Sequence, residues 1–430
     1  MNRAMKDSNV DWLGQIPAHW NLKRAKFVFK QSSSKGNTNL VLLSATQDRG
    51  VVDKSTLEGV VQVAENADLS TFKTVHINDF VISLRSFQGG FEISHCEGVI
   101  SPAYTVFRLR EGDYVGYYKH LFKSIGFIDK INSLTVGIRE GKNIQNEDFS
   151  NMLIPVLSIP EQQSIADFLD KKCGEIDEMV SLQEKIVEEL KAYKQSVITE
   201  VVCKGLNPDV PMKDSGIEWI GQIPEGWRAK RLKFSCEVFG RIGFRGYTTD
   251  DIVADGEGAI TLSPSNMKEM TMDFSKRTYL SWNKYKESPE IMVYEGDVLM
   301  VKTGSSYGKC SFVDSLPMES TINPQIVVFK KHKDNAKYIA YYFQTPMALA
   351  FIKTSVVGGT IPTIAQEKIM NYYFAFPPRE EQNAIVDYLD TKCAEIDALI
   401  SLKQSKIEAL KEYKKSTIYE YITGKKELNG

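Results

Sequence analysis

Residues 162–182 read QQSIADFLDKKCGEIDEMVSL, and residues 382–402 read QNAIVDYLDTKCAEIDALISL. The two stretches align at a constant offset of 220 residues, as from Asp170 to Asp390. In the first copy the identical positions are Gln162, Ile165, Asp167, Leu169, Asp170, Lys172, Cys173, Glu175, Ile176, Asp177, Ser181 and Leu182. We interpret the stretches as copies of one duplicated segment, on which the organisation of the chain depends.

Apolar residues alternate three and four positions apart along each copy, which predicts long amphipathic helices over about 161–204 and about 380–424. Such a stripe is buried against another helix, and the two copies are most simply each other's antiparallel partner. Polar Gln183 and Lys194 interrupt the first stripe where Lys403 and Lys414 interrupt the second, which would fix one register. The predicted seam comprises Leu169, Cys173, Ile176, Val180, Val187, Leu190, Leu389, Cys393, Ile396, Ile400, Ile407 and Leu410.

A second duplicated segment, offset by 207 residues, reads KDSNVDWLGQIPAHW over 6–20 and KDSGIEWIGQIPEGW over 213–227. We call these segments the boxes. The identity continues from Lys23, Arg24, Lys26 and Phe27 to Lys230, Arg231, Lys233 and Phe234. The two Trp residues and the Ile-Pro pair of each box are interpreted as a packing plug, in preference to a solvent-facing binding element. By symmetry the first box should lie beside the end of the second helix, with the two ends of the chain close together.

The regions between boxes and helices differ widely and share only a thin skeleton. DFVISLR over 79–85 matches DVLMVKT over 297–303, and Ser101-Pro102 matches Asn323-Pro324. β-branched runs and glycine-bearing turns predict strands joined by exposed loops, with helical patches at 117–125 and 337–352. We predict an α+β protein: two mixed α/β domains separated by two long antiparallel coiled-coil helices, in a pseudo-twofold tandem repeat. The predicted bounds are 1–157 for the first box with the first mixed domain and 158–205 for the first helix. They are 206–377 for the second box with the second mixed domain and 378–430 for the second helix.

The composition and net charge of the chain exclude several classes of protein. The chain has 430 residues, 42% of them hydrophobic, and a formal net charge of −2, which argues against a protein that coats nucleic acid indiscriminately. No stretch reaches the ~18–20 uninterrupted apolar residues of a membrane span, and the start lacks a signal-peptide core, so we expect a cytoplasmic protein with no membrane partner. Six single cysteines and five histidines predict no metal site and no disulfide framework.

Three segments resemble motifs that bind phosphate, a flipped adenine or a dinucleotide, but none of them matches its motif. GSSYGKC over 304–310 has three residues between its glycines where a phosphate loop has four. Asn323-Pro324-Gln325-Ile326 lacks the second proline and the aromatic residue of the motif that holds a flipped adenine. Gly240, Gly243 and Gly246 have the wrong spacing for dinucleotide binding, and with Arg241 and Arg245 they predict a mobile basic loop. We therefore expect no catalytic site in this chain.

The duplicated boxes, the EQ…I-x-D-[FY]-LD-x-KC-x-EID helices and the two dissimilar regions between them resemble the specificity subunit of Type I restriction-modification systems. The resemblance covers essentially the whole chain. It implies a noncatalytic subunit that reads a bipartite DNA target, with one target-recognition domain per half-site and the helices setting the gap. It also implies that partner subunits methylate adenine at N6 or cleave the DNA.

The resemblance further implies the partners: double-stranded DNA, two modification (methyltransferase) subunits, and restriction subunits that translocate and cleave DNA. This chain is expected to bind no cofactor itself; S-adenosylmethionine, ATP and Mg would be bound by the partner subunits. Two alternatives stay open. One is the recognition subunit of a related fused restriction enzyme, and the other is a coiled-coil scaffold that binds no DNA.

Half-site reading needs side chains that donate to and accept from base edges, and cations that hold phosphates. In the first region we predict that these are Arg85, Ser86, Gln88, Arg139, Lys142, Asn143 and Gln145. In the second region we predict Arg241, Arg245, Lys302, Thr303, Ser305, Ser306, Tyr307, Lys309, Thr360 and Thr363. Asn323 and Gln325 are interpreted as structural.

Overall fold

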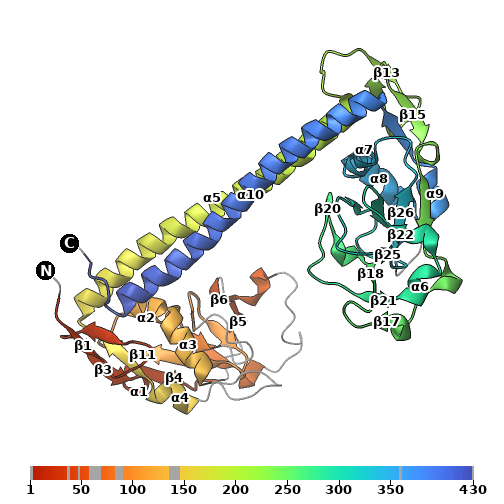
Figure 1. The fold of residues 1–430 in the computed structure, drawn as a ribbon. Helices are drawn as coiled ribbons and strands as arrows, with labels where there is room; N and C mark the ends of the chain where they lie inside the picture. The colour runs from red at the N-terminus through yellow and green to blue at the C-terminus, as the bar shows by residue number, and fades with distance from the viewer. Residues whose placement is uncertain are drawn as a thin grey trace. The chain divides into compact units, whose positions relative to one another are not determined.

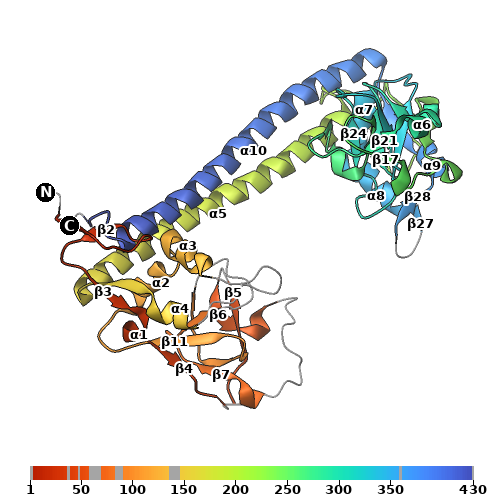
Figure 2. The same cartoon turned by 60° about the horizontal axis from the view of Figure 1, so that its bottom comes forward.

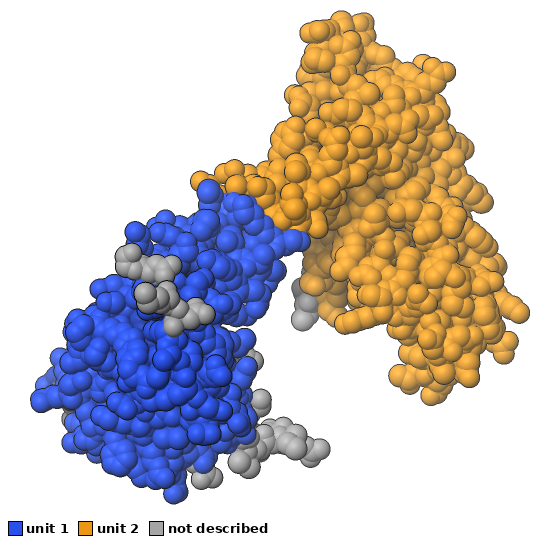
Figure 3. All heavy atoms as spheres, turned by 60° about the vertical axis from the view of Figure 1, so that its left-hand side comes forward, with its two compact units in different colours: residues 1–184, 404–430 blue, residues 185–403 orange. Residues whose placement is uncertain are grey.

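The structure is a computed structural model that describes residues 3–35, 39–46, 49–57, 69–82, 91–134, 146–357 and 361–428. The chain forms two compact units: unit 1 is 1–184 with 404–430, and unit 2 is 185–403 (Figure 3). Both units combine helices with short strands, which confirms the predicted α+β class. None of the described helices is both long enough and apolar enough to span a membrane.

The elements of unit 1 outside its main sheet and the long helices are β1 (Met5–Asp7), β2 (Gln15–Pro17), β3 (Asn21–Arg24), α1 (Ala25–Val28), β5 (Leu43–Thr46), β6 (Gly50–Asp53), η1 (Lys54–Thr56), η2 (Leu69–Thr71), β7 (Lys73–Val75), β10 (Gly98–Ile100), α2 (Val115–Leu121), α3 (Ile125–Ser133), α4 (Asn146–Asn151) and β12 (Leu153–Val156). Those of unit 2 are β13 (Met212–Asp214), β14 (Gln222–Pro224), β15 (Arg228–Arg231), η3 (Leu232–Phe234), η4 (Gly243–Arg245), η5 (Thr249–Asp251), β17 (Ile252–Val253), β18 (Gly258–Leu262), η6 (Pro264–Asn266), β19 (Met267–Lys268), β20 (Thr271–Met272), β21 (Tyr279–Ser281), α6 (Trp282–Lys286), η7 (Pro289–Ile291), β22 (Met292–Val293), β25 (Ser320–Ile322), α7 (Ala336–Phe343), α8 (Pro346–Thr354), β27 (Val356–Val357), β28 (Thr363–Ile364), α9 (Gln366–Met370) and β29 (Tyr373–Phe376).

Two long helices, α5 (Ile159–Lys204) and α10 (Arg379–Ile422), each contribute to both units, close to the predicted bounds. They lie side by side and antiparallel within each unit (Figures 1 and 2). In unit 1 the ring of Phe168 packs 4.5 Å from that of Tyr421, and further along α5 an ion pair joins Asp177 to Lys414. In unit 2 an equivalent ion pair joins Lys194 to Asp397.

The residues predicted for the helix seam lie on the inner faces of these helices. Each helix keeps its charged residues outside, so burial of one apolar stripe stabilises the pair. The buried members are Leu169, Cys173, Ile176, Val187, Leu389, Cys393, Ile396 and Ile407, and the half-buried members are Val180, Leu190, Ile400 and Leu410.

The main sheets of the two units have the same design. In unit 1 the strand order is β4-β11-β8-β9, with β4 at Phe29–Ser32, β11 at Thr105–Leu109, β8 at Phe80–Ile82 and β9 at Glu92–Ile93. In unit 2 the order is β16-β26-β23-β24, with β16 at Glu237–Gly240, β26 at Ile326–Lys330, β23 at Val298–Val301 and β24 at Cys310–Phe312. All neighbouring strands in both sheets are antiparallel. The hairpin β8–β9 therefore corresponds to the hairpin β23–β24.

A buried aspartate precedes the first strand of each hairpin. Asp79 accepts hydrogen bonds at 2.7 and 2.9 Å from the guanidinium of Arg108 on β11. Asp297 accepts one at 2.7 Å from Lys330, at the same place on β26. Each carboxylate also accepts a backbone N–H from three residues upstream, at 2.9 and 2.8 Å. Residues 79–82 and 297–300 thus occupy corresponding positions in the two units.

Identical residues at the start of the two long helices hold the variable region of each unit. The side-chain oxygens of Gln162 and Gln382, both fully buried, accept the backbone N–H of Tyr114 and of Asn335 at 2.7 Å. Further along, Asp170 receives hydrogen bonds from the short helix α2, and Asp390 receives them from α7. These contacts explain why the helix segments are alike although the regions they hold are not.

The boxes pack as predicted from the sequence. The rings of Trp20 and Trp227 are buried, and their indole N–H groups donate to Glu161 at 2.9 Å and to Glu381 at 3.1 Å. The ends of the chain meet in unit 1, where the guanidinium of Arg3 donates to the carbonyl oxygen of Gly424. The predicted closeness of the two ends is therefore confirmed.

Candidate nucleic-acid interface

Residues 302–309 form the loop after β23, and residues 83–90 follow the corresponding strand β8 in the sequence. The segment 83–90 contains the predicted contacts Arg85, Ser86 and Gln88, which lie outside the described residues. The loop at 302–309 is described throughout. The strands that precede the two predicted reading segments have the same place in the two sheets.

A second segment braces the loop of unit 2. The carbonyl oxygen of Lys302 accepts the N–H of Ile364 at 2.8 Å, and the N–H of Gly304 donates to Pro362 at 3.0 Å. The hydroxyl groups of Thr303 and Thr363 are 3.4 Å apart. The structure thus brings together two predicted segments that are about 60 residues apart in sequence, while Thr360 lies outside the described residues.

Lys302 has an unusual environment for a lysine. Burial lowers the pKa of its ammonium group, and among the described residues no carboxylate pairs with it and no side chain or carbonyl accepts its hydrogen bonds. A half-buried ammonium without a partner is destabilising. A bound anion or base edge would satisfy it.

Gly240 and Gln366 complete the surroundings of this ammonium group. A Cβ atom placed on Gly240 would lie 3.3 Å from Lys302 Nζ and 3.2 Å from the side-chain oxygen of Gln366. Gln366, at the start of α9, also donates to the carbonyl oxygen of Val238. Sequence reasoning missed Gln366, because nothing local connects it to a lysine so distant in the chain.

The remaining residues of the loop divide into two groups. Ser305 is exposed, Ser306 is half-buried, and Tyr307 packs partly against the hydrophobic core of unit 2. Gly308 has a left-handed backbone (φ +83°) and would hold a Cβ only 3.1 Å from Ile352, so glycine is needed there. Ser305 and Ser306 remain available to a ligand.

Lys309 lies in a different setting. It lines a cavity of 610 Å³ in unit 2, whose other lining residues include Lys194 of α5, Lys337 and Tyr341 of α7, and Asp397 of α10. Lysines and carboxylates are mixed in this lining. Lys309 therefore does not share the surroundings of Lys302.

The expectation of a mobile basic loop at Arg241 is wrong. Only 6% of Arg241 is exposed, and its guanidinium donates to the carbonyl oxygen of Ile322 and to the hydroxyl of Thr321, both at 3.2 Å. Arg241 joins β16 to β25 from inside unit 2. Arg245 is half-buried and pairs with Glu290 at 3.4 Å.

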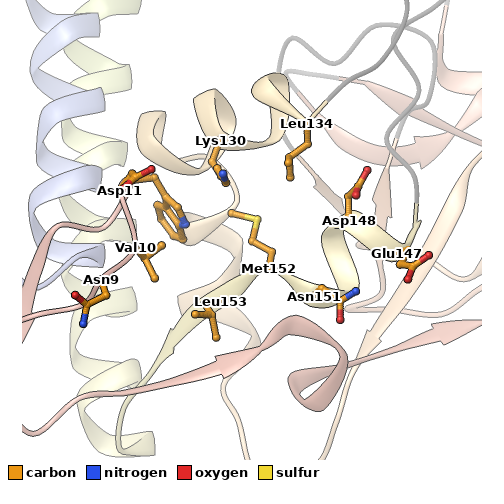
Figure 4. Close-up of a pocket in the computed structure, with 11 residues that line it drawn as sticks. Asn9, Val10, Asp11, Lys130, Leu134, Glu147, Asp148, Asn151, Met152 and Leu153 are labelled. Carbon is orange, nitrogen blue, oxygen red and sulfur yellow. The ribbon is translucent and has the colours of Figure 1, made fainter.

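The other predicted segment of unit 1 contains Arg139, Lys142, Asn143 and Gln145, which also lie outside the described residues. Its flanking residues Leu134 and Glu147 line a cavity of 360 Å³ between α3, α4 and the first box (Figure 4). Asp11 and Asp148 contribute further carboxylates, against the single ammonium of Lys130. This described lining is acidic and repels phosphate.

The structure places Asn323 and Gln325 in a turn beside the loop. Asn323 is buried and its side-chain oxygen accepts the backbone N–H of Gln325 at 3.0 Å. The carbonyl oxygen of Gln325 in turn accepts the N–H of Lys302 at 2.7 Å. Within the described part of the chain, no three His, Cys, Asp or Glu side chains are grouped as metal ligands would be.

Residues 258–429 match the family described as the Type I restriction modification DNA specificity domain. This part of the chain is similar to a Type I DNA specificity domain. It includes the loop at 302–309, the segment 362–364 that hydrogen-bonds to this loop, and α10. The resemblance predicted from the duplicated motifs is thereby confirmed.

Curated relatives of the chain are also Type I specificity subunits. The specificity subunit of the type I restriction enzyme MjaVIII of Methanocaldococcus jannaschii is 23% identical over 298 residues, which is 67% of this chain and 66% of that protein. The EcoKI specificity subunit of Escherichia coli is 23% identical over 315 residues, 70% of this chain and 62% of that protein. The matches thus span less than two thirds of the relatives' own length.

Solved structures show the same fold. A chain from a study of complex assembly and conformational transition of the type I R-M system superposes with a TM-score of 0.73 at 16% identity, covering 95% of this chain and 98% of that one. The HsdS subunit from Thermoanaerobacter tengcongensis superposes with a TM-score of 0.51 at 17% identity and the same coverage. The pairing of two α+β regions with two long helices is therefore shared with these proteins.

Proposed function

We propose that this chain is the noncatalytic DNA-recognition subunit of a Type I restriction-modification complex and reads a bipartite target, one half-site per unit. One observation carries the proposal: the corresponding strand pairs β8–β9 and β23–β24 are connected by different sequences, SLRSFQGG over 83–90 and KTGSSYGK over 302–309. A common frame with unlike loops fits two readers of different sequences. The antiparallel helices α5 and α10 then set the gap between the half-sites.

In unit 2 the reading surface centres on Lys302, with Thr303, Ser305, Ser306 and Thr363 beside it. Lysine donates to the O6 and N7 atoms of guanine, and hydroxyl groups donate to and accept from either base edge. The unsatisfied ammonium of Lys302 gains its partner only when DNA is bound, which favours a role in recognition. In unit 1, Arg85, Ser86 and Gln88 have the corresponding role.

The long helices also carry apolar side chains that the helix pair does not bury. Unit 1 exposes Met179 and Leu182 on α5 and Tyr413 on α10. Unit 2 exposes the matching Leu399 and Leu402 on α10 and Tyr193 on α5. Equivalent apolar patches, one per unit, suit two copies of one partner. We assign them to two modification subunits, which bring S-adenosylmethionine and methylate adenine at N6, while restriction subunits add ATP-driven cleavage.

Selection from random DNA tests the proposal. The purified complex of this chain with the modification subunit encoded beside it is mixed with random duplex DNA, and the retained fragments are sequenced at several salt concentrations. We expect enrichment of two short motifs at one fixed gap, with affinity that falls as salt rises because phosphate contacts release counterions. An assembled complex that enriches no motif would instead support the coiled-coil scaffold.

A recognition subunit of a related fused restriction enzyme would enrich the same kind of split motif. The partner distinguishes it: a fused enzyme supplies methylation and cleavage from one polypeptide. Copurification from the native host, followed by mass determination of each partner chain, separates the two cases.

A further inference from the structure

Four residues just after each box are identical in the two halves, while a buried residue among them differs. Lys23, Arg24, Lys26 and Phe27 recur as Lys230, Arg231, Lys233 and Phe234. The residue inside this run is Ala25 in unit 1 and Leu232 in unit 2, and both side chains are fully buried. Packing normally constrains buried residues more than exposed ones. In unit 2 Lys230 and Arg231 are half-buried and donate hydrogen bonds to Asp334 and Tyr373, so the fold accounts for those two. The Lys-Phe pair that follows is exposed in both units, and for this pair a ligand, and not the fold, accounts for the likeness.

The two phenyl rings stand out on the surface. Phe27 is 64% exposed on α1 and Phe234 is 57% exposed on η3. The ammonium of Lys26 lies 5.6 Å from the centre of the Phe27 ring, and that of Lys233 lies 5.5 Å from the Phe234 ring. The geometry of ring and cation is therefore reproduced in both units.

Other repeated exposed residues of the boxes have structural roles, and these rings do not. Lys6 donates to the carbonyl oxygen of Trp20 at 2.6 Å, and its counterpart Lys213 donates to that of Glu225. Such bonds explain why those lysines recur. The rings of Phe27 and Phe234 belong to neither hydrophobic core.

These residues lie at the end of each sheet away from the reading loop. In unit 1, Phe29 at the start of β4 pairs with Leu109, whereas Ile82, which leads into the loop, pairs with Thr105 at the other end of β11. Unit 2 has the same register, because Glu237 pairs with Lys330 and Val301 pairs with Ile326. A ligand at the rings is thus separate from the bases being read.

The chemistry of the patch indicates a protein partner. In unit 1 the exposed cations Lys23 and Arg24 accompany Lys26, and Arg110 donates to the backbone of Lys26 at 3.4 Å. Phosphates would be held by the cations alone and would leave the phenyl ring unused. An aromatic side chain ringed by charges is instead typical of an anchor in a protein interface.

We propose that Lys26 with Phe27, and Lys233 with Phe234, are two equivalent docking points, one for each of two copies of a partner protein. The docking surface of that partner has an apolar pocket for one phenyl ring and carboxylates at the rim of the pocket. The proposal rests on the proposed function, which supplies such a partner in the modification subunit.

Titration of the purified chain with its modification subunit tests the proposal. The variants Lys26→Glu/Phe27→Ser and Lys233→Glu/Phe234→Ser are made singly and together, and bound copies are counted by native mass spectrometry. We expect two copies on the native chain, one tight and one about tenfold weaker or absent on each single-unit variant, and loss of both in the combined variant. Ile77→Ser and Ile252→Ser, which change exposed apolar residues without a repeated counterpart, serve as controls and keep two copies.

Several outcomes would contradict it. If the native chain binds two copies and the combined variant binds two with unchanged affinity, the docking proposal is wrong and the proposed function stands. If the native chain binds no modification subunit, both are wrong. If the variants keep both copies but bind DNA with a smaller salt dependence, the patch is a phosphate contact. Lys26→Glu alone, which leaves the ring in place, must also weaken binding, and thermal unfolding of each variant shows that the fold is kept.

Discussion

Lys414 on α10 holds both carboxylate oxygens of Asp177 on α5, at 2.7 and 2.6 Å. Lys194 on α5 makes the same contact with Asp397 on α10, at 2.8 Å to each oxygen. All four residues are related by the offset of 220 residues, so each helix supplies one lysine and one aspartate in the same register. The lysines that interrupt the apolar stripe thus define how the helices pair, while the buried stripe supplies the stabilisation.

Reversing these lysines should weaken the helix pair and reversing the aspartates should restore it. Lys414→Glu places two carboxylates together, and we expect a loss of about 1 kcal/mol in the free energy of unfolding, because the pair is largely exposed. Asp177→Lys in the same chain should restore it. Urea unfolding of the three chains measures both effects, and the absence of any rescue would show that the pair does not set the register.

The equivalent change in unit 2 should be only partly rescued. Lys194 also pairs with Glu269 at 2.9 Å, and that carboxylate remains when Asp397 is replaced by lysine. Burial lowers the pKa of Lys194, but hydrogen bonds from the ammonium to Asp397 and Glu269 outweigh it and raise the pKa overall. The same unfolding measurement on Lys194→Glu with Asp397→Lys checks this asymmetry.

Carboxylates in the seam should unfold the helix pair. Ile176 is fully buried and Ile396 is 2% exposed, so Ile176→Asp or Ile396→Asp leaves a charge in an apolar interface. We expect either change to lower the free energy of unfolding by about 3–5 kcal/mol. Leu402, 64% exposed, provides the control, because Leu402→Asp in the isolated chain should leave the midpoint of thermal unfolding unchanged. Equal midpoints for the seam variants and the control would exclude the described pairing.

His120 should make unit 1 sensitive to mild acid. Burial lowers the pKa of His120 from 6.5, and its hydrogen bond with Asp170, at 2.6 Å, offsets this only in part. Because the folded pKa is below the unfolded one, stability is complete above pH 6.5 and is lost as pH falls towards the folded pKa. Asp170 acts at lower pH: burial raises its pKa, but hydrogen bonds from His120 and Lys119 hold it at about 2, so its contribution is present above pH 3.8 and is lost as pH falls towards 2.

The counterpart of His120 in unit 2 suggests the control. Tyr341 donates to Asp390 at 2.7 Å and does not gain a proton in this range. His120→Tyr should therefore remove the loss of stability that begins below pH 6.5. Thermal unfolding between pH 4.5 and 8 compares the two chains, and identical slopes below pH 6.5 would contradict the role of His120.

Replacing Lys302 should weaken DNA recognition without lowering the stability of the fold. Lys302→Met removes a half-buried ammonium, so the free energy of unfolding should stay the same or rise, while one half-site loses about 1–3 kcal/mol of discrimination. Gly240→Ala should weaken the same half-site by displacing the Lys302 and Gln366 side chains. Gly243→Ala meets nothing within 4 Å and should change neither property. Binding assays with each half-site altered in turn measure these effects. Loss of recognition at both half-sites together would show that Lys302 supports the fold and does not read one half-site.

Features set by local pattern could be predicted from the sequence. The heptad stripe determines which face of each helix is buried, and the matching stretches after Asp79 and Asp297 do lie on corresponding strands. Each predicted helical patch, however, is two helices. The signal for the break at 344–346 was present: Pro346 begins α8, and the hydroxyl of Thr345 accepts the N–H of Ala348 at 3.3 Å as a helix cap.

Features set by distant parts of the chain could not be predicted. The glycines around Arg241 suggest a loop, but its partners Thr321 and Ile322 are about 80 residues away in sequence, and they bury the guanidinium. The position of Gln366 beside Lys302 depends likewise on the packing of α9 against β16. Sequence pattern therefore predicted the loop at 302–309 but not the residues that surround it.

The most direct measurement is the N6-methyladenine map of a host that lacks other methyltransferases and expresses this chain with its modification partner. The map is repeated with residues 21–156 or residues 228–376 replaced by the corresponding region of another specificity subunit. A split motif methylated in both halves, one half changing with each replacement and the gap constant, is the predicted result. If one replacement changes both halves, or if the assembled complex methylates no split motif, the two units are not independent readers joined by a fixed helical spacer.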